Sequence, residues 1–114
     1  MQGWWQIVSE REHGRPGRNA QTSNLRLSVK GDSLQYFLGE QGADAWTITV
    51  DDSTRPPALD KMPLGSPKGT KPSLQGRVSV EGEILKIGWI SDSERSKDLS
   101  GDRGVAITFK RERR

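Results

Sequence analysis

Apolar and polar residues alternate with a period of two along much of the chain. Leu25, Leu27 and Val29 are each followed by a polar residue, and the same alternation recurs in several later segments. This period predicts strands with one buried and one solvated face, as antiparallel sheets allow. No segment repeats apolar residues at the i, i+3, i+4 and i+7 spacing over the length of a helix. The pattern therefore predicts an all-β protein.

The alternating segments define eight predicted strands. They cover residues 4–12, 25–30, 33–39, 45–51, 57–62, 74–81, 84–91 and 104–111. Gly31 and Gly82 lie between neighbouring strands at hairpin spacing. Pro56 and Pro57 exclude a central strand around them, so the strand that follows is predicted to be a short edge strand. Residues 63–73, with three prolines and two glycines, are predicted to form a long irregular loop.

Strands that mostly join to their sequence neighbours predict an up-and-down sheet. Rolling such a sheet into a closed barrel removes its exposed edges. We therefore predict one domain over residues 1–114, folded as an eight-stranded antiparallel up-and-down barrel of the lipocalin-like kind. A small β-sandwich or an OB-like barrel is the alternative architecture. A barrel of eight strands is just wide enough to be filled by side chains or to hold one small ligand.

Composition narrows the chemistry that such a barrel could carry. The 114 residues are 31% hydrophobic, which leaves too thin a core for a multilayer α/β enzyme. The chain has no cysteine and one histidine. Disulfide frameworks, cysteine-bound metals and thiol catalysis are excluded, and a histidine-based nucleophile relay has little support. We expect no enzymatic activity, no metal site and no cofactor.

The charges are mixed rather than gathered in one segment. Eighteen Lys and Arg against fifteen Asp and Glu give a net charge of +3. A nucleic-acid surface needs cations on one face, so nucleic acid is an unlikely partner. No run approaches the ~18 apolar residues of a membrane helix, and no signal peptide is visible. The compartment stays open between the cytoplasm and an exported form without its leader, and a monomer is expected.

Two polar features resemble catalytic groups but have simpler interpretations. His13 precedes a glycine in a polar turn, with no nucleophile or carboxylate at a spacing that would make it a general base. Asp51 and Asp52 precede Ser and Thr. In such segments an Asp side chain more often caps a turn by hydrogen bonding to the nearby backbone. We interpret both features as structural.

The aromatic residues are the most informative candidates for a site. Trp5, Trp46 and Trp89 fall on the predicted dry faces of their strands, whereas Trp4 falls on the opposite face. Inward tryptophans could fill the sparse core or line a cavity for a ligand. The candidate ligand-binding residues of the interior are Trp5, Tyr36, Trp46, Val78, Ile87, Trp89 and Phe109.

Three segments carry a resemblance to known families. They are Gly3-Trp4-Trp5-Gln6-Ile7-Val8-Ser9, the DDSTRPPALD sequence of residues 51–60 and the LQGRVSVEGEILKI sequence of residues 74–87. The first is similar to the G-x-W strand that opens lipocalin-like barrels. All three together resemble a family of small uncharacterised bacterial domains that is abundant in planctomycetes. The resemblance implies a lipocalin-like barrel in which Lys110 or Arg111 packs across Trp5, and it implies no reaction.

Two functions are consistent with this sequence. The first is a non-enzymatic barrel that binds a small apolar or amphipathic ligand in its interior. The alternative is a protein–protein interaction or inhibitor module that acts through long loops, because loops on rigid scaffolds often carry recognition. The predicted loops at the rims are residues 12–24, 63–73 and 92–103.

Overall fold

The structure is a computed structural model that describes residues 1–16, 24–67, 69–89, 99 and 104–112. The strands in these ranges are β1 (Gly3–Glu12), β2 (Arg15–Pro16), β3 (Leu25–Lys30), β4 (Ser33–Leu38), β5 (Gln41–Asp51), β6 (Ala58–Pro63), β7 (Leu74–Glu81), β8 (Ile84–Trp89) and β9 (Val105–Arg111). The described residues include no helix that is a candidate for spanning a membrane. Residues 17–23 of one predicted rim loop and most of 92–103 lie outside these ranges.

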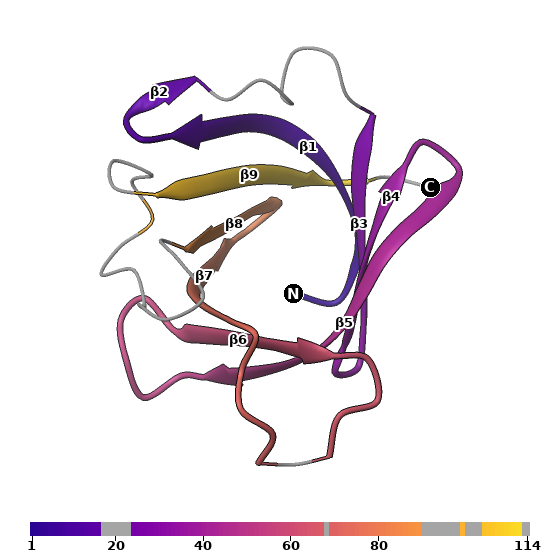
Figure 1. Cartoon of the computed structure of the whole chain (residues 1–114). Coiled ribbons are helices and arrows are strands. Elements are labelled where there is room, and N and C mark those ends of the chain that lie inside the picture. Colours follow the sequence, from indigo (N-terminus) through magenta and orange to yellow (C-terminus); the bar gives the residue numbers. More distant parts are fainter. Residues whose placement is uncertain (17–23, 68, 90–98, 100–103, 113–114) are drawn as a thin grey trace.

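The strands form one closed antiparallel barrel. From β3 to β9 each strand pairs with its sequence neighbour, β1 pairs with β3, and β1 also pairs with β9 to close the sheet (Figure 1). β2 is an addition that pairs only with the end of β1. The predicted eight-stranded up-and-down barrel is therefore confirmed, with one short strand added.

The position of β6 differs from the prediction. β6 was expected at an edge, but it pairs with β5 on one side and β7 on the other. Pro56 and Pro57 precede the strand and Pro63 is its last residue. The prolines therefore leave the middle of β6 free to donate hydrogen bonds, and the inference of an edge strand was wrong.

The start of β5 and the presence of β2 also differ from the prediction. β5 begins at Gln41 rather than residue 45, and its pairing with β4 shifts register between Gln35 and Phe37. Gly42 lies at this irregularity, where an added Cβ would come 2.8 Å from the Gln35 side chain. β2 has two residues, too few for an alternation to reveal. Residues 90–91 of the predicted strand 84–91 lie outside the described ranges.

The interior is packed around two aromatic side chains, Trp5 and Phe109, which are fully buried. Trp5 donates a hydrogen bond from Nε1 to the Met1 carbonyl at 3.0 Å. The Arg111 guanidinium lies 4.2 Å from the centre of a Trp5 ring, and its Nη1 donates to the Gln2 carbonyl at 2.7 Å. The contact between Trp5 and a basic residue of the last strand, expected from the resemblance, is thus made by Arg111.

A second aromatic cluster lies outside the barrel. Trp4 packs against Phe37 at 5.0 Å between ring centres, and the Arg26 guanidinium lies 4.6 Å from a Trp4 ring centre. Arg26 also forms a bidentate pair with Glu112, at 2.6 and 2.8 Å. Trp4 therefore lies on the face predicted for it. The ion pair of this cluster links Arg26 of β3 to Glu112, the residue that follows β9.

Candidate functional site

The seven predicted site residues separate into two groups. Trp5, Val78, Ile87 and Phe109 are buried in the hydrophobic core. The remaining three, Tyr36, Trp46 and Trp89, are only partly buried, and all three surround one lysine side chain. The structure therefore brings three of the candidates together and gives the other four places in the core.

The lysine is Lys61 of β6, which is only 4% exposed. Its Nζ donates a hydrogen bond to the Tyr36 hydroxyl at 2.5 Å. The same nitrogen lies 4.6 Å from the Tyr36 ring centre, 4.7 Å from that of Trp89 and 6.0 Å from that of Trp46. We name Lys61, Tyr36, Trp46 and Trp89 the lysine box.

Strand register assembles the lysine box. Lys61 pairs with Ile48 of β5, a buried residue, so its side chain shares the interior face with Ile48. Trp46 lies two residues earlier on β5, on the same face. Trp89 pairs with Gly76 of β7, where an added Cβ would lie 2.3 Å from the Gly88 carbonyl oxygen. Glycine at position 76 therefore allows β7 and β8 to meet beside the box.

Burial changes the acid–base properties of the box. It lowers the pKa of Lys61 to about 8, because the ammonium loses hydration, and the charge of Asp44 partly opposes this change. Burial also raises the pKa of the Tyr36 hydroxyl above its usual value, and Asp44 adds to the effect. Among the described residues, Lys61 has no carboxylate within ion-pair distance. The electron-rich faces of the surrounding aromatic rings stabilise the positive charge of Lys61 in place of a carboxylate.

Lys61 was not among the predicted site residues. The segment Ala58-Leu59-Asp60-Lys61-Met62 has apolar residues at both odd and even positions, so its alternation does not define the inner face. The usable signal is Leu59, which is buried and lies two residues before Lys61. If the inner face of β6 is assigned from Leu59, Lys61 falls on the same buried face.

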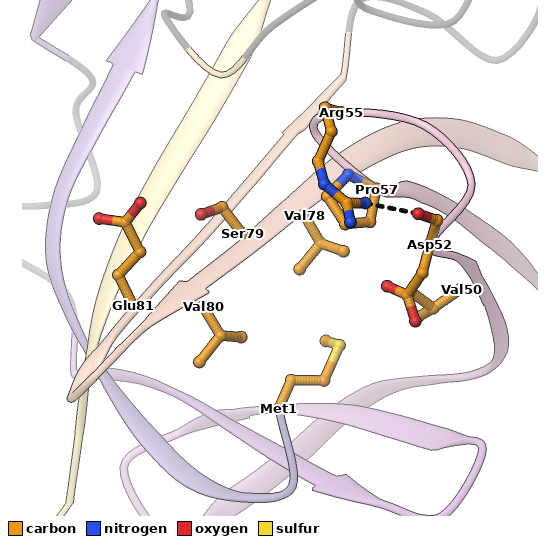
Figure 2. Close-up of a pocket in the computed structure, with 9 residues that line it drawn as sticks. All are labelled: Met1, Val50, Asp52, Arg55, Pro57, Val78, Ser79, Val80 and Glu81. Atoms are coloured by element: carbon orange, nitrogen blue, oxygen red, sulfur yellow. Dashed lines mark hydrogen bonds between the residues drawn. The ribbon is translucent and has the colours of Figure 1, made fainter.

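A pocket of about 560 Å³ lies where β5 and β7 end. We name it the mouth pocket; its lining residues are Met1, Val50, Asp52, Arg55, Pro57, Val78, Ser79, Val80 and Glu81. Figure 2 shows Met1, Val50, Val78 and Val80 around its apolar part. Val50 and Val80 are 42% and 41% exposed, so the pocket presents apolar surface to solvent.

The polar side of the mouth pocket comes from the loop between β5 and β6. Arg55 donates from Nη1 to the Asp52 carbonyl at 2.5 Å (Figure 2) and to the Thr54 carbonyl at 3.0 Å. Its Nε and Nη2 have no partner among the described residues. Arg77 of β7 supports the loop by donating to Thr54 Oγ1 and to the Pro56 carbonyl. The loop thus holds one guanidinium edge free beside an apolar surface.

The two structural interpretations made from the sequence can be placed in the fold. Asp51 accepts a hydrogen bond from the Ser53 amide at 2.9 Å, so it caps a turn as predicted. His13 lies in the turn between β1 and β2, with a positive φ of 50°. In the described ranges no group of three or more His, Asp or Glu residues is arranged to hold a metal ion.

Comparison with protein-family models, with curated proteins and with solved structures finds no match to this chain. The resemblance to the bacterial domain family therefore stays a prediction. The lysine box and the mouth pocket are the features that bear on function.

Proposed function

We propose that the protein is a non-enzymatic, lipocalin-like barrel that binds a small amphipathic ligand in the mouth pocket. The observation that carries the proposal is that one pocket is lined both by the partly exposed Val50 and Val80 and by Arg55, whose guanidinium has a free edge. Ligand sites commonly combine a mostly apolar lining with a few fixed polar groups. The mouth pocket has this composition.

The apolar part of the ligand would cover Val50, Val78 and Val80. Val50 and Val80 lie on the inner face of their strands but are only partly covered by other side chains. Each methylene of a ligand that leaves water here contributes about 0.8 kcal/mol before the cost of association. A ligand of about ten carbons would therefore bind with a dissociation constant on the order of 0.1–1 mM.

A carboxylate is the head group that fits the polar side. The Nε and Nη2 donors of Arg55 form the planar edge that binds a carboxylate through two hydrogen bonds. Asp52 and Glu81 lie on opposite sides of the pocket in Figure 2, so an ammonium head could pair with only one of them at a time, without the two parallel hydrogen bonds that the Arg55 edge offers a carboxylate. We therefore propose a medium-chain carboxylate, or a molecule of that shape, as the ligand class.

Titration with decanoate below its micelle concentration tests this proposal. We expect backbone amide shifts in two-dimensional NMR at Val50, Val78 and Val80. The Trp5 indole signal should shift as well, because Trp5 donates to the carbonyl of Met1, a pocket residue. Decylamine should bind at least several-fold more weakly. If decanoate shifts none of these signals, the interaction-module alternative becomes the better account.

One pair of variants and one pair of ligands sharpen the test. Arg55→Gln should weaken decanoate binding about ten-fold, since a charge-assisted hydrogen bond is lost, whereas Arg15→Gln on exposed β2 should not change it. Arg55→Gln should leave the affinity for decanol, which has no carboxylate, nearly unchanged. Equal losses for decanoate and decanol would contradict the role of Arg55 as the carboxylate partner.

A further inference from the structure

The lysine box combines features that make an amine a nucleophile. The Lys61 amine is buried and has no carboxylate within ion-pair distance among the described residues; the more distant charge of Asp44 opposes the effect of burial only in part. With a pKa of about 8, roughly a tenth of the amine is neutral at pH 7, far more than for an exposed lysine. Desolvation in an apolar site is a known route to reactive lysines.

We propose that the lysine box is a covalent capture site in which Lys61 forms an imine with a small aldehyde. The Lys61 nitrogen attacks the carbonyl carbon, and the carbonyl oxygen gains a proton to give a carbinolamine. The carbinolamine then loses its hydroxyl as water, so one amine and one aldehyde give one imine and one water. No oxidant or reductant is consumed. The site is separate from the mouth pocket and does not depend on the function proposed for it.

The Tyr36 hydroxyl is placed to move the proton in this reaction. It lies 2.5 Å from Lys61 Nζ, within reach of an oxygen on the carbon bonded to that nitrogen. Because burial raises its pKa, the hydroxyl keeps its proton through the neutral range and can donate it to the departing oxygen. Tyr36 is therefore expected to speed the loss of water.

The aromatic faces would stabilise the product. A protonated imine keeps a positive charge at the position of Nζ, where rings of Tyr36 and Trp89 lie 4.6 and 4.7 Å away. Cation–π attraction is strengthened when the cation is desolvated. Flat, uncharged aldehydes fit these walls best, because a charged group would lose its hydration among the rings. An aromatic aldehyde is thus the expected class.

The box must open for the reaction to occur. Lys61 is 4% exposed, but Trp46 and Trp89 are only partly buried, so movement of an indole would give access. The proposal and simple burial make opposite predictions. If the box opens, Lys61 reacts faster than exposed lysines; if it stays closed, Lys61 is the protected one.

Reductive labelling separates these outcomes. The full-length protein would be treated with benzaldehyde and cyanoborohydride at pH 7, with labelled positions quantified by peptide mass spectrometry. Lys86, exposed on β8, is the reference within the same sample. We expect Lys61 to be labelled at least ten-fold faster than Lys86, and the ratio to vanish in denaturant. Labelling of Lys61 at or below the rate of Lys86 would overturn the proposal.

A pH profile and one variant test the chemistry. The rate at Lys61 should level off above about pH 8, because most of its amine is then neutral, and Lys86 in the same sample serves as the reference. Tyr36→Phe keeps the ring and removes the hydroxyl, and it should slow Lys61 labelling about ten-fold without changing Lys86. Parallel profiles for the two lysines would contradict the proposal. Decanoate binding should be the same in Tyr36→Phe, so failure here is distinguishable from failure of the proposed function.

Discussion

The lysine box and the mouth pocket lie toward opposite ends of β7, and the barrel interior is closely packed at the box but open to solvent at the pocket. At the box end, Gly76 lets the β8 backbone at Gly88 and Trp89 approach β7 closely, beside a buried amine. At the other end, Val80 faces inward yet is 41% exposed. The same strand alternation supplies both ends. The two ends differ because different side chains from the neighbouring strands cover the inner face of β7. Aromatic rings enclose an amine at the box, whereas apolar side chains remain exposed at the mouth pocket.

The largest expected effect comes from breaking the close approach at the box. Gly76→Ala places a Cβ 2.3 Å from the Gly88 carbonyl oxygen, a backbone atom that cannot turn away. We expect the free energy of unfolding to fall by about 3 kcal/mol, at the upper end for overpacking in a core. Urea unfolding measures this change, and Ser79→Ala on the same strand should alter stability by less than about 0.5 kcal/mol.

The next effect is a pH dependence of stability that belongs to the box. The folded pKa of Lys61, about 8, lies below the unfolded value, so the unfolded chain binds more protons between these two values. The free energy of unfolding should therefore rise by about 2 kcal/mol from pH 8 to pH 10, because of the lowered pKa of Lys61. Above pH 10 it should fall, because folded Tyr36 keeps a proton that the unfolded chain releases.

Urea unfolding at several pH values measures this profile. Lys61→Met should remove the rise between pH 8 and pH 10, whereas Lys86→Met, at an exposed position, should keep it. A rise that survives in Lys61→Met would assign the titration to another group.

The smallest effect on stability is expected at the mouth pocket. Val80→Glu adds a charge to a half-exposed position, so stability should change by less than about 1 kcal/mol. Decanoate binding should nevertheless be lost, because the carboxylate repels the ligand head and reduces the apolar lining. Val8→Glu, at a 52% exposed valine on β1, is the matched control and should bind decanoate normally. Loss of binding in both variants would place the ligand elsewhere.

The fold was largely predictable because alternation reports the face of each residue. The phases of Trp5, Trp46 and Trp89 were read correctly from it. Alternation does not report which strands neighbour one another, so it could not place β6 between β5 and β7. It also could not separate Trp5, fully buried, from Trp46 and Trp89, which surround Lys61.

The two candidate sites were less accessible to sequence reasoning for a related reason. Lys61 belongs to a segment without clear alternation, and its burial depends on rings from three other strands. Val50 lies two residues after the buried Ile48 on the same face of β5, but its exposure depends on where Met1 and the loop with Arg55 lie. Both sites depend on contacts between residues far apart in the chain, which local patterns do not encode.

The seam between β1 and β9 has a consequence for how the protein is made. Trp5 pairs with Arg111 across it, so β1 finds this partner only after β9 has left the ribosome. Until then β1 can pair only with β2 and β3 and leaves open the edge that β9 will cover, which is a hazard for aggregation during synthesis. Contacts this distant in sequence also slow folding, since a long loop must close before they form. Nascent chains that stop before residue 105 should therefore require protection that the finished barrel does not.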